Sequence, residues 1–240
     1  MKPFYCRTGS KRSLIKKILL LIPEHSVYVE PFIGGGAIYF AKEPSEYEII
    51  NDLDSELITN YKLLQKIKGR DFPTNLNTLP KLTKYYFGNA NKQTDKLTKS
   101  IIKTCNGFAG RQVSNKLYTS SNPYSKLKLI DEYQERMSNT KILNQSYEKL
   151  FKYDSPETFF YLDPPYESSE GLYKDTIIDY EEMRRLLDKI KGKFLLSIND
   201  SPYIRKVFKG YKIKGFTLKA FGNKNSIGGN PRKELFIRNY

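Results

Sequence analysis

The sequence predicts an α/β fold, a mostly parallel sheet with helices packed on it, and one inserted, mostly helical subdomain. Strand-like apolar runs alternate with segments of helical periodicity at both ends of the chain, a pattern typical of parallel sheets covered on both faces. Between these ends, residues 69–139 are polar, rich in Lys, Asn and Thr, and show no strand alternation. The 240 residues, 39% of them hydrophobic, suffice for one substantial core and a smaller subdomain.

The N-terminal part contains the first alternation of helix and strand. Its expected elements are a helix at residues 10–21, strands at 27–32 and 48–51, the start of a helix at 37–40, and a helix at 53–68. The first helix is expected because apolar residues recur at helical spacing, and Pro23 ends it. The last presents one apolar face, on which Leu57, Tyr61 and Leu64 lie.

Strand-like runs return after the polar segment. The expected strands cover residues 141–143, 158–162, 194–198, 211–216 and 235–238. A helix is expected at 180–191, where Asp179 and Glu182 form a capping box, and a short helix begins at Ser201-Pro202. The predicted division is discontinuous, because residues 1–52 and 140–240 form one domain into which residues 53–139 are inserted.

The charge balance indicates a polyanionic partner. The chain has 41 Lys and Arg against 26 Asp and Glu, a formal net charge of +15, which suits a nucleic-acid phosphate backbone. A lysine bias from an AT-rich genome is the alternative explanation, and it would also account for the many Asn, Ile and Tyr residues.

Cysteine, histidine and hydropathy argue against several classes of protein. Two cysteines and one histidine are too few for a disulfide scaffold or a zinc site, and they argue against a Ser-His-Asp mechanism. We therefore expect no metal, and chemistry that rests on carboxylates, amides, aromatic rings or a cofactor. No apolar run approaches the roughly 18 residues of a membrane span, and no signal peptide is recognisable. The expectation is an intracellular protein, cytoplasmic or virus-encoded, with no membrane partner.

Two motifs near the N-terminus suit a ligand. The strand at 27–32 runs into Gly34-Gly35-Gly36, and glycines let a backbone turn sharply and approach a ligand closely, with the helix expected at 37–40 offering its N-terminal amides. The pattern is not G-x-G-x-x-G, which argues against a dinucleotide. Asp52 ends the second strand, where an acidic side chain can bind ribose hydroxyls. The alternatives are a plain turn for the glycines and a helix N-cap for Asp52.

The most specific signal is Asp163-Pro164-Pro165-Tyr166, which follows the apolar strand at 158–162. Two prolines fix φ and remove two N–H donors, so the loop is stiff and its carbonyls remain acceptors. Together with the Asp163 carboxylate and the flat Tyr166 ring, these acceptors suit a planar group that bears an NH2. An ordinary proline-rich strand exit is the alternative.

These residues resemble a known family. Asp163-Pro164-Pro165-Tyr166 looks like the DPPY motif of amino-group methyltransferases, residues 31–36 resemble their glycine loop, and residues 7–11 are similar to the N-terminal motif of the DNA adenine methyltransferase (Dam) family. The order of these motifs, with an insertion before DPPY, matches the alpha group of those enzymes. The resemblance implies a Rossmann-like methyltransferase sheet that binds S-adenosylmethionine (SAM). It also implies a catalytic domain at 1–52 and 140–240 and a target-recognition subdomain at 53–139.

The resemblance further implies roles for individual residues. Those implied in binding SAM, or its product S-adenosylhomocysteine, are Arg7, Lys11, Glu30, Phe32, Gly34, Gly35, Gly36, Asp52, Ser146, Tyr147 and Asp163. Those implied at the reacting base are Asp163, Pro164, Pro165 and Tyr166. Asp52 would hold the ribose, and Asp163 would sit where cofactor and base meet. Many relatives carry an aromatic residue where this chain has Arg7, whose guanidinium can also stack on a flat ring.

The implied reaction is methyl transfer from SAM to N6 of adenine in double-stranded DNA, after the base is flipped out of the duplex. Asn106, Phe108 and Arg111 are candidate DNA contacts, because Asn and Arg read bases in the major groove and Phe108 suits the space left by the flipped base. Phe108 in the core and Arg111 as a solvated charge are the alternative. GATC is the leading candidate sequence, whereas a cognate restriction endonuclease and the oligomeric state stay open.

Two rival functions stay open. RNA amino-group methyltransferases carry a similar Asp-Pro-Pro motif, although they usually lack so long an insertion before it. A catalytically inactive nucleic-acid-binding module would not need Lys11, Asp52 and Asp163 all intact, and absence of SAM binding would favour it. A third class, the protein-glutamine methyltransferases, is disfavoured, because such an enzyme is expected to carry Asn in place of Asp163.

Overall fold

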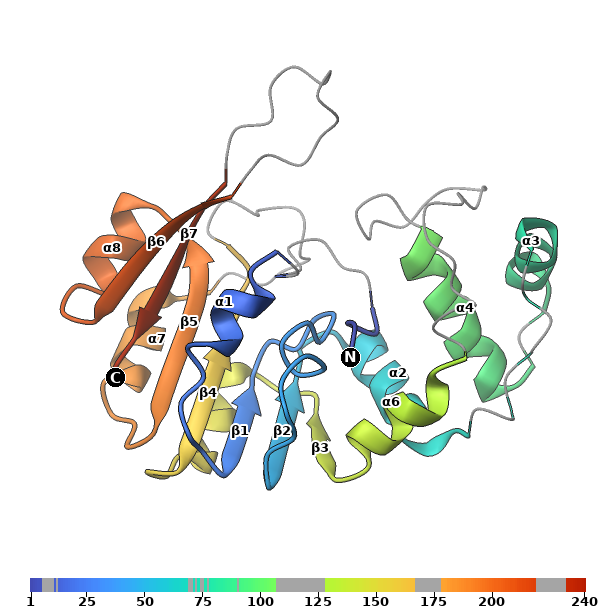
Figure 1. The fold of residues 1–240 in the computed structure, drawn as a ribbon, viewed down its shortest axis with the longest axis horizontal. Helices are drawn as coiled ribbons and strands as arrows, with labels where there is room; N and C mark the ends of the chain where they lie inside the picture. The colour runs from blue at the N-terminus through green and yellow to red at the C-terminus, as the bar shows by residue number, and fades with distance from the viewer. Residues whose placement is uncertain are drawn as a thin grey trace, which may run out of the picture. The chain divides into compact units, whose positions relative to one another are not determined.

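The predicted α/β class is confirmed in the computed structural model (Figure 1). The model describes residues 1–5, 11, 13–68, 71, 73, 76, 78–89, 91–106, 128–166, 178–218 and 232–240. These residues contain a seven-stranded sheet in the order β3-β2-β1-β4-β5-β7-β6. Its strands are β1 (Val27–Glu30), β2 (Tyr47–Asn51), β3 (Thr140–Leu143), β4 (Thr158–Leu162), β5 (Lys193–Asn199), β6 (Lys212–Leu218) and β7 (Arg232–Arg238). All seven strands lie where the sequence predicts them, to within three residues at each end.

The helices of the described residues precede or lie between these strands, four of them in succession between β2 and β3. They are α1 (Ile15–Leu19), α2 (Ser55–Lys66), α3 (Leu79–Phe87), α4 (Gln93–Asn106), α6 (Ile130–Met137), the 3-10 helix η3 (Tyr147–Tyr153), α7 (Tyr180–Leu187) and α8 (Pro202–Val207). The first of them ends two residues before the end of the helix predicted at 10–21, and residues 10 and 12 of that prediction lie outside the described residues. It ends before Pro23, which disfavours helical backbone in the residue that precedes it.

The helix start predicted at 37–40 is wrong, because the chain forms a run of turns there. The N–H of Phe40 donates to the Gly36 carbonyl at 3.0 Å, and the N–H of Lys42 donates to the Ile38 carbonyl at 2.9 Å. Residues 37–40 are all buried, so the segment lacks the solvent-facing side of an amphipathic helix, and Pro44 stops any continuation. The glycine turn therefore has no helix N-terminus directly behind it.

The contacts divide the chain into two compact units. The first unit comprises Met1–Leu20, Ile33–Pro44 and Ile50–Gln145, and the second comprises Leu21–Phe32, Ser45–Ile49 and Ser146–Tyr240.

In the first unit, α2 packs against α4, α6 and β3, and α3 packs against α4. The face of α2 predicted to be apolar, with Leu57, Tyr61 and Leu64, is buried. Tyr133 makes edge-on ring contacts with Phe4 at 4.8 Å and with Phe40 at 5.2 Å between ring centroids, an arrangement that aromatic pairs prefer. This aromatic core supports the turn that follows the glycines.

In the second unit, β1, β4 and β5 are parallel, whereas β7 pairs antiparallel with both β5 and β6. Every residue of β4 is buried, as expected for a central parallel strand. Parallel strands end at the same edge of a sheet, so the loops that follow β1, β4 and β5 leave from one edge. Ligands bind at this edge in open α/β sheets.

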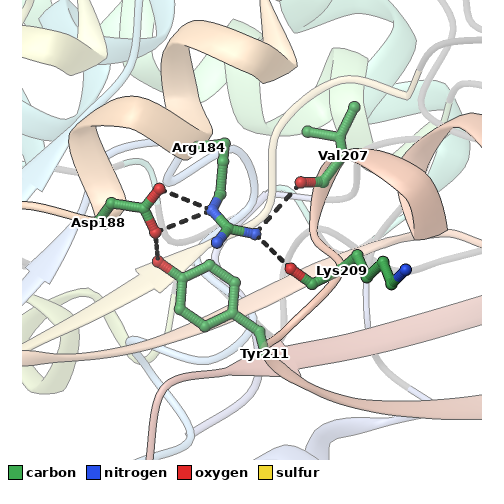
Figure 2. A network of polar contacts seen from close by, with 5 residues as sticks. All are labelled: Arg184, Asp188, Val207, Lys209 and Tyr211. Carbon is green, nitrogen blue, oxygen red and sulfur yellow. Dashed lines mark hydrogen bonds and ion pairs between the residues drawn. The ribbon is translucent and has the colours of Figure 1, made fainter.

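The side chains of Asp179 and Ser201 cap α7 and α8 of the second unit, at the positions predicted. Asp179 accepts a hydrogen bond from the Glu182 N–H at 2.9 Å at the start of α7, and Ser201 accepts one from the Ile204 N–H at 3.2 Å at the start of α8. At the end of α8 and in the turn that follows it, the carbonyls of Val207 and Lys209 accept hydrogen bonds from the guanidinium of Arg184 (Figure 2). Arg184 thus links α7 to the turn that leads into β6.

Candidate functional site

In the first unit, the glycine turn has two residues in left-handed backbone conformations. Gly34 has φ of 46° and Gly36 has φ of 70°, values that side chains other than glycine's rarely tolerate. A Cβ at Gly36 would lie 2.7 Å from the Phe40 ring, whereas a Cβ at Gly34 would meet no described atom within 4 Å. The turn therefore packs on the core at Gly36, whereas the described part of the chain leaves open space at Gly34.

The Asp52 carboxylate is bound to this turn. The Gly34 N–H donates to Asp52 Oδ2 at 2.9 Å, and the Asp54 N–H donates to Asp52 Oδ1 at 3.0 Å. The Tyr61 hydroxyl donates to the Gly34 carbonyl at 2.9 Å. Asp54 is the N-cap of α2, because its carboxylate accepts from the Leu57 N–H at 3.0 Å. The capping alternative for Asp52 is thereby excluded, and its side chain spans the turn and the loop before α2.

Lys11 lies inside the first unit with only 4% of its surface exposed. Burying an ammonium group is costly unless it meets polar or charged groups, so Lys11 is not one of the solvated surface charges. Arg7, Phe108 and Arg111 lie outside the described residues. Asn106 is the last residue of α4, and the position of its side chain lies outside the description as well.

In the second unit, the rings of Phe32 and Tyr147 face each other at 5.3 Å between centroids, with an interplanar angle of 35°. Phe32 follows β1, and Tyr147 begins η3 directly after its N-cap residue Ser146. Burial raises the pKa of Tyr147, and the carboxylates of Glu148, Asp179 and Glu182 raise it further. Among the described residues, the buried Tyr147 hydroxyl has no hydrogen-bond partner. A buried hydroxyl in that state is costly, and a ligand could supply the missing bond.

Asp163-Pro164-Pro165-Tyr166 leaves the sheet at the carboxyl end of β4, the position that the sequence predicts. Pro164 is buried, while Asp163 and Tyr166 are partly exposed. The Tyr180 hydroxyl of α7 donates to the Pro165 carbonyl. The Tyr166 hydroxyl donates to the Glu234 carboxylate, 2.7 Å from Oε1 and 2.8 Å from Oε2. The loop is thus held by a helix on one side and by β7 on the other.

Buried acidic groups gather at the same edge of the second unit. Glu30, at the end of β1, is 2% exposed and accepts a 2.6 Å hydrogen bond from the Tyr28 hydroxyl. Tyr161 is buried in β4. Burial raises its pKa well above the ordinary value, and the nearby Asp163, Glu30 and Glu234 carboxylates raise it further. Tyr161 therefore stays a neutral phenol among three acidic side chains.

Sequence reasoning missed Glu234, Ser197 and Tyr180. The strand predicted at 235–238 excluded Glu234, although an acidic residue directly before Leu235-Phe236-Ile237 is unusual for a buried strand.

No group of three or more His, Cys, Asp or Glu residues in the described part of the chain is placed to hold a metal ion. None of the helices described is long and apolar enough to cross a membrane.

Comparison with known proteins identifies the family. A family model described as D12 class N6 adenine-specific DNA methyltransferase matches residues 8–219. The chain belongs to this family. As a D12 class methyltransferase it acts on DNA adenine and takes its methyl group from SAM, and the predicted resemblance to the Dam family is confirmed.

Three relatives of this D12 class methyltransferase are named type II methyltransferases. M1.LlaDCHI of Lactococcus lactis subsp. cremoris is 29% identical, with 100% of this chain and 96% of the relative covered. M.CviBI of Paramecium bursaria Chlorella virus NC1A is 28% identical, with 88% of each covered. M.MjaIII of Methanocaldococcus jannaschii is 27% identical, with 100% of this chain and 99% of the relative covered.

Proposed function

We propose that this protein is a site-specific methyltransferase that methylates N6 of an adenine flipped out of double-stranded DNA. The observation that carries the proposal is the Asp163-Pro164-Pro165-Tyr166 loop, which leaves the carboxyl end of β4 in a chain of this family. A base inside a duplex cannot reach such a loop, and flipping it out costs a few kcal/mol. The formal charge of +15 favours phosphate contacts that offset this cost.

The residues at the reacting base act by position and electrostatics. The amino nitrogen of adenine is a poor nucleophile, because its lone pair is delocalised into the ring. Hydrogen bonds from its two N–H groups to the Asp163 carboxylate and the Pro164 carbonyl would draw it towards tetrahedral geometry. The Tyr166 ring would stack on the base. No covalent intermediate with the protein is required, so the acceleration of methyl transfer comes from orientation and preorganised acceptors.

Several of the residues proposed for the cofactor offer groups that suit SAM. Bound SAM supplies an electrophilic methyl group on sulfur and leaves as S-adenosylhomocysteine. The open space at Gly34 admits a ligand against the backbone. Each carboxylate oxygen accepts more than one hydrogen bond, so the two N–H contacts of Asp52 orient it and are compatible with ribose hydroxyls. Phe32 and Tyr147 offer aromatic surface, and the Tyr147 hydroxyl is a buried polar group in need of a partner.

The other residues proposed for the cofactor follow from the family resemblance. They are Arg7, Lys11, Glu30, Gly35, Gly36, Ser146 and Asp163. Lys11 and Glu30 are both buried, so neither is a solvated surface charge.

Target recognition is assigned to residues 53–139, with Asn106, Phe108 and Arg111 as the DNA contacts. GATC is the sequence proposed, because the chain resembles Dam-type enzymes. A cognate restriction endonuclease is also proposed, because three relatives are named type II methyltransferases.

The test is transfer of a labelled methyl group from SAM to unmethylated double-stranded DNA, with the product nucleosides identified. Label in N6-methyladenine is expected. Label only in RNA would show that the substrate is RNA and not DNA. No transfer together with no SAM binding would point to a nucleic-acid-binding module. Oligonucleotides that contain or lack GATC, compared under the same conditions, test the sequence.

A further inference from the structure

Glu234 is a buried acidic residue that the proposed reaction does not yet use. It lies in β7 with 2% of its surface exposed, next to the buried Leu235 and Phe236. A buried carboxylate is costly unless it is hydrogen-bonded. Two hydroxyls donate to it, Tyr166 at 2.7 and 2.8 Å and Ser197 at 2.8 Å. Hydrogen bonds to an ionised carboxylate are roughly twice as strong as bonds between neutral groups.

The strand register explains why these groups meet. In the antiparallel pair β5–β7, Asn199 lies opposite Glu234 and Ser197 lies opposite Phe236. Residues two apart on a strand share a face, so Ser197 and Glu234 project from the same face of two neighbouring strands. Both strands belong to the sheet, whereas Tyr166 belongs to the loop after β4. Glu234 therefore fastens a loop residue to the rigid part of the second unit.

We propose that Glu234 is a positioning residue, which holds the Tyr166 ring in the orientation that stacks on the target adenine. The inference rests on the proposed function. The backbone holds one end of the tyrosine side chain, and the single hydroxyl proton, donated to the carboxylate, holds the other end. Fixing both ends sets the axis of the ring before the base arrives. Such preorganisation acts on the rate of transfer, because small misplacements at a reacting centre are costly.

The test is a double-mutant cycle on single-turnover methyl transfer to unmethylated DNA, with saturating SAM. Tyr166→Phe keeps the ring and removes the hydroxyl, whereas Glu234→Gln keeps the shape and removes the charge. Each is expected to lower the rate about tenfold. Because both variants act on the same contact, which Tyr166→Phe removes and Glu234→Gln weakens, the double variant is expected to be no more than about twofold slower than the slower single variant. Thermal unfolding and SAM affinity, measured on every variant, separate this coupling from a general loss of fold.

The matched control is Glu181→Gln, an exposed glutamate of α7, which is expected to keep the wild-type rate. If Glu234→Gln fails to fold, Glu234→Asp keeps the charge and withdraws it by one methylene, and a partial loss of rate is expected. Folded Tyr166→Phe at the wild-type rate would overturn the inference, as would losses that simply multiply in the double variant. An active wild type with either result leaves the proposed function standing, whereas a wild type that transfers no methyl group to adenine would overturn both.

Discussion

The backbone N–H of Gly34 donates a 2.9 Å hydrogen bond to Oδ2 of Asp52, 18 residues further along the chain. The other carboxylate oxygen accepts from the Asp54 N–H at 3.0 Å. The Asp52 carboxylate is therefore held in one orientation by two backbone N–H groups, one in the glycine turn and one just before α2. Because both oxygens are used in this way, Asp52 serves the structure as well as the ligand proposed for it.

Replacement of Asp52 by Asn should weaken SAM binding more than it weakens the fold. Asn keeps one acceptor for a backbone N–H and loses the charge and the second acceptor. Losing hydrogen bonds to a charged group is expected to raise the SAM dissociation constant about 10- to 100-fold, as isothermal titration calorimetry can measure. Asp54→Ala is the control, because it removes the N-cap of α2 at a cost of about 1 kcal/mol and should leave SAM affinity unchanged. If folded Asp52→Asn bound SAM as tightly as the wild type does, Asp52 would not be the residue that binds the ribose.

Gly34→Ala and Gly36→Ala are expected to fail in different ways. Both introduce a Cβ at positive φ, which costs about 1–2 kcal/mol. At Gly36 the new methyl group also lies 2.7 Å from the Phe40 ring, so overpacking should bring the total loss of unfolding free energy to about 2–5 kcal/mol. At Gly34 the space is open, so the smaller loss of stability should accompany clearly weaker SAM binding. Urea unfolding and SAM titration of both variants make the comparison. Unchanged SAM affinity in Gly34→Ala would count against a ligand at this turn.

Asp163→Asn tests the acceptor proposed for the adenine amino group. The amide can turn an NH2 towards that group, where the carboxylate only accepts hydrogen bonds. We expect the single-turnover rate to fall on the order of 10²–10³-fold with the unfolding temperature little changed. Asp131→Asn, at an exposed position of α6, is the control for the loss of one negative charge. A rate within a few-fold of the wild type would show that Asp163 is not the hydrogen-bond acceptor of the adenine amino group.

The strands could be predicted because each is specified by a contiguous run of residues. Buried parallel strands read as apolar runs, and β4 is buried at every position. The motif after it could be found for the same reason, since Asp163-Pro164-Pro165-Tyr166 is contiguous in the chain. The segment at 37–40 defeated the same reasoning, because four consecutive apolar residues satisfy a helix and a buried turn equally well.

Glu234 could not be found from periodicity, because its partners come from distant parts of the chain. Tyr166 and Ser197 lie 68 and 37 residues away. The pairing of β7 with β5 brings Ser197 to Glu234, whereas Tyr166 reaches it from the loop after β4. The structure was likewise needed to tell which of Asp52 and Asp54 is the N-cap of α2. Both precede a helix in the sequence, and only the bond from the Leu57 N–H to Asp54 distinguishes them.

Arg111→Ala tests the sequence contact proposed for the inserted segment. An arginine that reads a guanine contributes about 1–3 kcal/mol of discrimination at that base pair, so the variant should methylate altered sites relatively better than the wild type does. Rates on a set of duplexes with single substitutions in the preferred site measure this. Lys96→Ala, at an exposed position of α4, is the control and is expected to leave the relative rates on the different duplexes unchanged. A uniform loss in Arg111→Ala would make it a phosphate contact.

Asp188 gives the second unit a contribution to stability that depends on pH (Figure 2). Its carboxylate accepts from Arg184 Nε at 2.8 and 2.9 Å and from the Tyr211 hydroxyl at 2.6 Å. The hydrogen bond from Arg184 is the main cause that lowers the pKa of Asp188 below its ordinary value of 3.8, and the bond from Tyr211 lowers it further. A carboxyl group whose pKa is lowered by folding stabilises the protein above its unfolded pKa. That contribution disappears as the pH falls through the folded pKa.

Asp188→Asn should therefore destabilise the protein at neutral pH and have progressively less effect as the pH falls below 3.8. Arg184 and Asp188 side chains are 25% and 47% exposed, so solvent screening limits the loss to about 1 kcal/mol or less. Urea unfolding at several pH values measures the difference between variant and wild type. Glu182→Gln, which breaks the more exposed pair with Arg185 on the same helix, should have a smaller effect. A loss in Asp188→Asn that stays constant across the acid range would mean that packing against Tyr211, and not the charge, holds α7 to β6.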